Sequence, residues 1–288
     1  CYHNFRQDHT ASGMMRLTGT CNKSPDHTET RCIMNSYIRI CDIEKYYGNA
    51  SHVTKAIDRL TFTVKKGEFM GVMGPSGSGK TTLLNLLSTI DRVSAGHIFY
   101  EDTDITALSE DDLAEFRKNN LGFVFQEYNL LDTLTIEENI SLALTLQGNS
   151  KKSILETTAK LLKFLDIEEI RGKFPYQVSG GQKQRCACAR ALACDPKLLL
   201  ADEPTGALDS LSSQTLLETF TKLNQTLGTT ILMVTHDAFC ASYCSRILFL
   251  RDGKIFHELL RADRSRQLFL QDILDVLSFT GGKTTENL

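Results

Sequence analysis

The sequence predicts an α/β protein with a largely parallel β-sheet. From residue 37 onward, short apolar segments of strand length alternate with longer segments of helical periodicity, which is typical of repeated βα units. One connection between a strand and a helix is unusually rich in glycine. Between Gln126 and Pro175 only helical patterns occur, so we expect a helical subdomain inserted into the sheet.

The strands are predicted from short runs of apolar residues. These runs are residues 37–43, 69–73, 121–125, 198–201 and 231–234. The last three have the length of buried strands, and we expect them in the core sheet. A hairpin is expected over residues 246–256, because the Asp252-Gly253 pair tolerates the positive φ angles of a tight turn.

The helices are predicted where apolar residues recur every three or four positions. One follows the glycine-rich turn, and its apolar stripe consists of Leu83, Leu84, Leu86, Leu87 and Ile90. Two more, at residues 136–146 and 154–165, belong to the inserted subdomain. A final amphipathic helix covers about residues 265–277.

One further helix precedes the last predicted core strand. Its expected apolar face consists of Leu216, Phe220, Leu223 and Leu227. Gly228 directly follows, and glycine commonly ends helices because it adopts the left-handed conformation without strain.

The composition limits the class of protein. The chain has 288 residues, of which 41% are hydrophobic, so disorder throughout is excluded. Its 32 basic and 35 acidic residues give a net charge of −3, which argues against a protein held mainly to nucleic acid phosphates. No apolar run approaches the ~18 residues of a membrane-spanning helix. Nine scattered cysteines, an odd number, favour a reducing, cytosolic compartment over a disulfide framework.

Residues 1–33 are polar and have neither the apolar core of a signal peptide nor any periodicity. We expect either an upstream extension, with the native start at Met34, or a disordered tail. A lipid-modified Cys1 is the alternative. The expected domain lies at residues 34–260, with its helical subdomain at about 127–190, and residues 261–288 form a C-terminal helix and polar tail.

Residues 74–81 match the phosphate-binding pattern G-x-x-x-x-G-K-[ST] between a predicted strand and a predicted helix. Backbone N–H groups and the positive helix end point at phosphates in such a loop. Lys80 should reach the β- and γ-phosphates, and the Thr81 hydroxyl should bind Mg²⁺. The predicted nucleotide-binding residues of this segment are Gly74, Pro75, Ser76, Gly77, Ser78, Gly79, Lys80, Thr81 and Thr82.

Three further candidate residues follow predicted strands. Asp202 and Glu203 come directly after residues 198–201, and His236 follows residues 231–234. The carboxyl ends of parallel strands meet at one edge of the sheet, where ligands bind. We expect Asp202 to hold Mg²⁺, Glu203 to act as general base toward an attacking water, and His236 to contact the γ-phosphate or that water.

Together with these motifs, the pentapeptide Val178-Ser179-Gly180-Gly181-Gln182 resembles the signature of ABC transporter ATP-binding subunits. The resemblance covers about residues 36–260. It implies a P-loop NTPase core of the RecA type, an antiparallel β portion and an inserted helical subdomain. It also implies hydrolysis of Mg-ATP by a head-to-tail homodimer, in which Ser179, Gly180, Gly181 and Gln182 act on the partner protomer's ATP. Val178 replaces the more usual leucine, a small apolar exchange.

The resemblance adds three residues to the site. Gln126 matches a glutamine that contacts Mg²⁺ or water and responds to the membrane partner. Tyr47 matches the aromatic residue that stacks on adenine, with Tyr46 as the alternative. Asp209 matches a loop along the dimer seam, and a helix cap by Asp209 or Ser210 is compatible with that position.

At finer detail, the phosphate loop and residues 174–190 and 233–239 look like the bacitracin-export type within the macrolide-export and lipoprotein-release group. This implies a separate permease, a peripheral location at the cytoplasmic side of the plasma membrane, no nucleic acid partner, and resistance to peptide antibiotics. Lipoprotein release or envelope signalling is the alternative. A soluble ABC ATPase or a P-loop kinase is less favoured, as is a zinc site formed by His236, Cys240 and Cys244.

Overall fold

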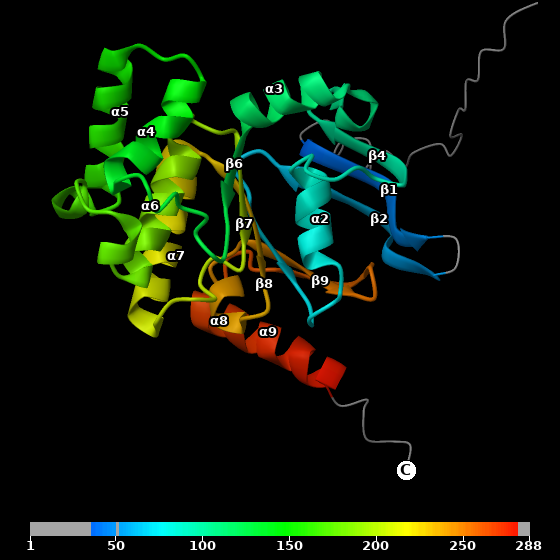
Figure 1. Ribbon diagram of the computed structural model, residues 1–288. Helices are drawn as coiled ribbons and strands as arrows, with labels where there is room; N and C mark the ends of the chain where they lie inside the picture. The colour runs from blue at the N-terminus through cyan, green and yellow to red at the C-terminus, as the bar shows by residue number, and fades with distance from the viewer. Residues whose placement is uncertain (1–35, 50–51, 282–288) are drawn as a thin grey trace, which may run out of the picture. The chain divides into compact units, whose positions relative to one another are not determined.

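The computed structural model describes residues 36–49 and 52–281, and its fold is drawn in Figure 1. The predicted start at Met34, the expectations for residues 1–33 and the last seven residues of the tail lie outside the described residues. The strands and α-helices in chain order are β1 (Ser36–Asn49), β2 (His52–Lys65), β3 (Phe69–Met73), α2 (Lys80–Leu87), β4 (Ala95–Tyr100), β5 (Thr103–Asp104), α3 (Glu110–Asn120), β6 (Leu121–Val124), α4 (Ile136–Leu146), α5 (Lys151–Phe164), α6 (Gly180–Leu192), β7 (Leu198–Asp202), α7 (Ser210–Leu227), β8 (Thr230–Thr235), α8 (Ala238–Ala241), β9 (Arg246–Arg251), β10 (Lys254–Leu260) and α9 (Arg266–Gly281).

The six-stranded sheet has the order β10-β9-β3-β8-β7-β6. Its strands are parallel except β10, which pairs antiparallel with β9. The three strands predicted for the core sheet are confirmed there as β6, β7 and β8, and the structure shows that they are neighbours. The predicted hairpin is confirmed as well, because Asp252 and Gly253 both have positive φ angles between β9 and β10.

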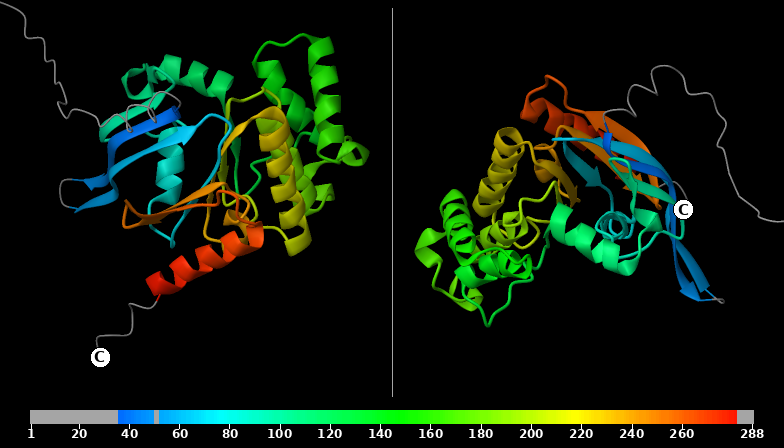
Figure 2. Two further views of the ribbon diagram at one scale, coloured as in Figure 1. Left: turned by 180° about the vertical axis from the view of Figure 1, so that it is seen from behind. Right: turned by 90° about the horizontal axis from the view of Figure 1, so that it is seen from above.

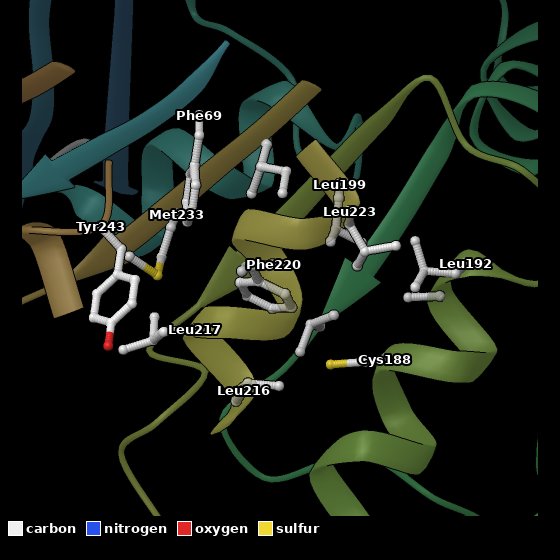
Figure 3. Close-up of a cluster of buried hydrophobic side chains, with 14 of the residues drawn as sticks. Phe69, Cys188, Leu192, Leu199, Leu216, Leu217, Phe220, Leu223, Met233 and Tyr243 are labelled. Carbon is white, nitrogen blue, oxygen red and sulfur yellow. The ribbon is translucent and has the colours of Figure 1, made fainter. Parts of the chain in front are cut away.

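The central strands β3 and β8 are buried at every position and are mostly apolar, as expected for a sheet with both faces covered. Phe69 and Met233 face one core, which is closed by α6, α7, α8 and α9. Figure 3 shows Phe220 of α7 within this core, between Tyr243 on one side and Leu192 on the other. The alternate residues of the same strands face a second core, which contains α2 and strands of the antiparallel sheet.

The antiparallel sheet has the order β2-β1-β4-β5. It confirms the antiparallel portion of the predicted fold, although the pattern of apolar residues had indicated only the first part of β1. Helix α2 lies between the two sheets (Figure 1). The glycine-rich turn directly precedes Lys80, the first residue of α2. It therefore lies where the two sheets meet.

Helices α4, α5 and α6 lie together beside the six-stranded sheet in every view (Figures 1 and 2). Helices α4 and α5 lie within the segment in which strand patterns were missing, and α6 follows it. Each begins at a Ser or Thr residue whose side chain accepts a hydrogen bond from a backbone N–H of the first turn, at Thr135, Ser150 and Ser179 respectively.

Two predicted helix positions are wrong. Helix α2 ends at Leu87, and Ile90 lies beyond it with 58% of its surface exposed. Thr89 has a positive φ of 59°, so the chain turns away before Ile90. Leu227 is the last residue of α7 and is 65% exposed, although Leu216, Phe220 and Leu223 of the same predicted face are buried.

None of the helices in the described residues combines the length and the apolar character that crossing a membrane requires. The cysteines in the same part of the chain are all free. Cys186 and Cys188 are buried in α6 and belong to the core.

Candidate functional site

The phosphate loop connects β3 to α2, as its pattern predicts. Gly79 precedes the helix with a φ of 103°, a conformation that a side chain would strain. A Cβ atom on Gly79 would also lie 2.6 Å from the carbonyl oxygen of Ala56 in β2. The glycine therefore allows both the turn and the close approach of β2. On the other side, the N–H of Gly253 donates to the carbonyl oxygen of Ser78 at 3.1 Å.

Lys80 is 8% exposed and its Nζ atom lies within its own loop. It donates to the carbonyl oxygens of Gly74 at 2.9 Å and Pro75 at 3.0 Å. These bonds satisfy a buried ammonium group when no phosphate is present. A phosphate oxygen would be a stronger acceptor at the same place, because both partners would then be charged.

A cavity of about 690 Å³ opens over this loop. Some of its lining residues were predicted from the sequence. These come from the phosphate loop, from the segment after β6, and from the ends of β7 and β8. The cavity is lined by Thr54, Lys55, Ala56, Pro75, Ser76, Gly77, Gly79, Lys80, Thr81, Thr82, Gln126, Glu203 and His236. The fold thus brings together five chain segments that are far apart in the sequence.

Asp202 ends strand β7 beside the phosphate loop. Its carboxylate receives a hydrogen bond from Thr81, but its Oδ1 atom is buried and has no hydrogen-bond partner among the described residues. Burial raises the pKa of Asp202, and the neighbouring Glu203 charge adds to this effect, whereas Thr81 and Lys80 oppose it. A divalent cation would supply the missing partner and the missing positive charge. The oxygen donors of Thr81 and Asp202 fit Mg²⁺, which prefers hard oxygen ligands.

Glu203 and His236 lie side by side at the same sheet edge. The His236 Nδ1 atom is 2.8 Å from Glu203 Oε2, and the His236 backbone N–H donates to that oxygen at 3.3 Å. Glu203 has a φ of 46°, an uncommon conformation for a residue with a side chain. The bond from its N–H to the Val234 carbonyl oxygen, at 2.9 Å, anchors it there. The carboxylate therefore faces the cavity from a fixed backbone.

Gln126 also lines the cavity, and its neighbours are held by the helical subdomain. Gln184 of α6 donates to the carbonyl oxygen of Phe125 at 3.3 Å, and Arg190 donates to those of Tyr128 at 3.0 Å and Asn129. Sequence reasoning did not identify Gln184 or Arg190. Because α6 also carries Gln182, Lys183 and Arg185, residue type alone did not single them out.

The residues of the signature pentapeptide begin helix α6. Ser179 Oγ accepts from the Gln182 N–H at 3.3 Å, and Gln182 Oε1 accepts from the Ser179 N–H at 3.0 Å, which forms a capping box. Ser179 is therefore the N-cap of α6. None of the four signature residues lines the cavity of its own chain.

Asp209 caps α7 by accepting from the Ser212 N–H at 2.9 Å, so the compatible capping role is realised. Helices α6 and α7 approach closely at their beginnings. A Cβ atom on Gly181 would lie 2.7 Å from the Ser212 hydroxyl oxygen. The signature helix and the Asp209 loop therefore form one packed unit.

The two candidate tyrosines both lie in β1 and are similarly exposed, at 39% for Tyr46 and 42% for Tyr47. Neither lines the cavity, but Tyr47 pairs across the strands with Thr54 and hydrogen-bonds Thr82, which both line it. Tyr46 pairs with Lys55, a third lining residue. The wall formed by Thr54, Lys55 and Ala56 was not predicted, because β2 carries no continuous apolar run.

Beneath Glu203 and His236 lies a second polar contact that sequence reasoning missed. The Cys240 thiol donates to Asp237 Oδ2 at 3.2 Å, so the Thr205 hydroxyl, 3.0 Å away, donates to the sulfur. Burial raises the pKa of Cys240 to about 12, which keeps the thiol protonated. The less favoured zinc site is absent: no group of metal-binding side chains forms within residues 36–49 and 52–281.

Comparison with known proteins gives consistent matches. The profile of a family described as ABC transporter matches residues 57–206. The bacitracin export ATP-binding protein BceA of Halalkalibacterium halodurans is 49% identical over 84% of this chain and 95% of its own length. A macrolide export ATP-binding/permease protein, MacB of Hyphomonas neptunium, is 41% identical over 77% of this chain but only 34% of its own length.

A solved structure matches with similar coverage. It is a dimeric, post-hydrolysis form of the ATP-binding cassette MJ0796 bound to ADP and phosphate. Its TM-score is 0.73 at 36% identity, over 77% of this chain and 98% of the other. The likeness therefore extends to nearly all of that cassette.

Proposed function

The chain belongs to the ABC transporter family as an ATP-binding subunit, and from this premise we propose that it hydrolyses Mg-ATP to drive a separate permease in export of, or resistance to, bacitracin-like peptide antibiotics. ATP binding and hydrolysis coupled to transport are properties of the family. The metal ion, the residue roles and the substrate are our proposals. The observation that carries them is the cavity in which the phosphate loop, Gln126, Glu203 and His236 meet.

The proposed chemistry is attack of water on the γ-phosphate. The loop N–H groups and Lys80 hold the triphosphate, and Lys80 exchanges its two carbonyl partners for phosphate oxygens. Glu203 takes the proton of the attacking water, and ADP leaves from the opposite side of the phosphorus. His236 fixes the Glu203 carboxylate and adds a donor near the γ-phosphate. Mg²⁺, bound by Thr81 and Asp202 with Gln126 nearby, would neutralise phosphate charge.

The signature residues are proposed to complete the site of a second protomer. Ser179 is exposed, and the helix behind it directs its positive end outward, which suits a phosphate. None of the signature residues lines the cavity of its own chain, and this supports the proposal that a phosphate at that helix end would belong to another copy. Two copies arranged head to tail would then share two nucleotides.

The permease is proposed to bind a groove of about 490 Å³ beside the helical subdomain. Phe123 and Phe125, stacked at 4.1 Å between ring centroids, form part of its wall together with Arg117 and Arg190. Phe125 lines this groove and the next residue, Gln126, lines the nucleotide cavity. A displacement of Phe125 in the groove would therefore be transmitted to Gln126 in the nucleotide cavity through one peptide bond. The protein would then be peripheral at the cytoplasmic side of the membrane.

The experiment deletes the gene in its host and measures growth inhibition by a panel of cell-wall peptide antibiotics. Complementation uses the wild type, Glu203→Gln and, as a matched control, Glu156→Gln on the remote helix α5. Selective sensitivity that wild type and Glu156→Gln reverse, but Glu203→Gln does not, is the expected result. An unchanged profile with the gene expressed would overturn the antibiotic substrate and favour lipoprotein release or envelope signalling.

A further inference from the structure

Strand β1 carries two consecutive tyrosines, each held by a carboxylate and covered by a lysine. The Tyr46 hydroxyl donates to Glu44 Oε2 at 2.6 Å, and Lys55 Nζ lies 5.2 Å from the ring centroid. The Tyr47 hydroxyl donates to Asp91 Oδ2 at 2.7 Å, and Lys45 Nζ lies 4.9 Å from that ring centroid. In each group the lysine also pairs with the carboxylate.

The two groups differ in what they connect. Glu44, Tyr46 and Lys55 all belong to the hairpin of β1 and β2, and the hydrogen bonds and ion pairs of their side chains stay within that hairpin. Asp91 instead follows helix α2, and its N–H donates to the Asn85 carbonyl oxygen of that helix at 3.1 Å. Tyr47 is therefore linked to the helix whose first turn binds phosphate.

Asp91 is more than a single hydrogen-bond acceptor. Its Oδ1 atom accepts from Lys45 Nζ at 2.5 Å and from the Arg92 N–H at 2.7 Å. The same lysine also donates to the Arg92 carbonyl oxygen at 2.8 Å. Burial by itself would raise the pKa of Asp91, but the hydrogen bonds from Lys45, Tyr47 and the backbone outweigh it and lower that pKa. The carboxylate is therefore ionised at neutral pH and stays an acceptor.

We propose that Asp91 is the positioning residue that makes Tyr47, and not Tyr46, the surface on which the nucleotide base stacks. The inference rests on the proposed ATP site. Lys45 covers one face of the Tyr47 ring, so the purine stacks on the other face. By tying the ring to α2, Asp91 sets the distance between the base and the phosphates. A base-binding surface held at a fixed position loses less entropy when the nucleotide binds.

The experiment compares Asp91→Ala with its matched counterpart Glu44→Ala in the purified full-length protein. KM for ATP and kcat are measured, together with competitive binding of inorganic tripolyphosphate, which has no base. We expect Asp91→Ala to raise KM for ATP by about threefold to tenfold, the effect of losing one positioning hydrogen bond. Its kcat and tripolyphosphate affinity should stay within about twofold of wild type. Glu44→Ala should match wild type in all three quantities.

Two conservative variants distinguish the loss of the Tyr47–Asp91 hydrogen bond from a general structural change. Asp91→Asn keeps an acceptor for Tyr47 and should recover most of the ATP affinity, whereas Tyr47→Phe removes the donor and should resemble Asp91→Ala. Equal KM values for Asp91→Ala and wild type would overturn the inference, as would an equal effect of Glu44→Ala or a loss of tripolyphosphate affinity in Asp91→Ala. Failure of the wild type to bind either ATP or tripolyphosphate would instead refute the proposed function itself.

Discussion

His236 Nδ1 lies 2.8 Å from Glu203 Oε2, and the backbone N–H of His236 donates to the same oxygen. The two residues are 33 positions apart and come from neighbouring parallel strands. Their contact holds the Glu203 carboxylate in the cavity above the phosphate loop, where the proposed general base would act.

Glu203→Gln should lower ATP hydrolysis by about 10²–10⁴-fold, the usual contribution of a general base. The amide has the shape of the carboxylate but cannot accept the water proton. ATP should still bind, so the variant should accumulate as a dimer with Mg-ATP, measured by light scattering after gel filtration. Glu156→Gln is the control. A variant that stays monomeric both alone and with its permease would contradict the shared-site mechanism.

Asp202→Asn should stabilise the nucleotide-free protein while abolishing its response to Mg²⁺. Because the folded state raises the pKa of Asp202, its ionised form costs stability above that pKa, and the cost disappears as the pH falls through it. Solvent screening at this partly exposed group limits the gain in Tm to about 2–4 °C.

Thermal unfolding of the wild type and of Asp202→Asn, measured from pH 7 down to acidic pH, tests the direction of this pH dependence. The variant's advantage in Tm should be largest at neutral pH and shrink as the solution is acidified. A variant that is less stable than wild type at pH 7 without nucleotide would show that the buried Oδ1 atom has a partner that the structure does not reveal.

Ser179→Ala should cost about 1 kcal/mol of unfolding free energy, because it removes the N-cap of α6. Ser150→Ala is its matched control, since Ser150 caps α5 through the same kind of bond at the same 3.3 Å. Denaturant unfolding should give similar losses for both. Only Ser179→Ala should also reduce ATPase activity. Equal ATPase activities of the two variants would show that Ser179 does not act in the shared nucleotide site.

Cys240→Ala should lower kcat by about threefold to tenfold with little change in ATP affinity, because it removes the link between Thr205 and Asp237 below the catalytic pair. Cys240→Ser retains both hydrogen bonds and should restore most of the activity. Cys244→Ala leaves a similar cavity one turn later and serves as control for packing. Steady-state ATPase kinetics of the three variants decide the outcome.

Much of the site follows from local patterns in the sequence. The phosphate loop is recognisable because its glycines and Lys80 must occur at fixed spacing. Asp202, Glu203 and His236 are recognisable because they directly follow apolar strands whose carboxyl ends meet at one edge. Ser179 is recognisable as a helix cap because of its spacing to Gln182. Each of these signals depends on neighbours within a few residues.

The remaining features depend on residues that are distant in the sequence. Lys55 reaches the cavity only because β2 packs against the phosphate loop, and Cys240 reaches Thr205 only because α8 folds back under β7. The exposure of Ile90 and Leu227 likewise depends on where the chain turns and what lies beside each helix end.

The sequence by itself determined the fold class, the phosphate loop and the strand-end residues, because these are set by periodicity and short-range spacing. The tertiary structure alone decided which tyrosine is linked to α2 through Asp91, which strand closes the cavity, and that no signature residue lines the cavity of its own chain. Those outcomes depend on the packing of two sheets and a helical subdomain, and no short stretch of sequence encodes that packing.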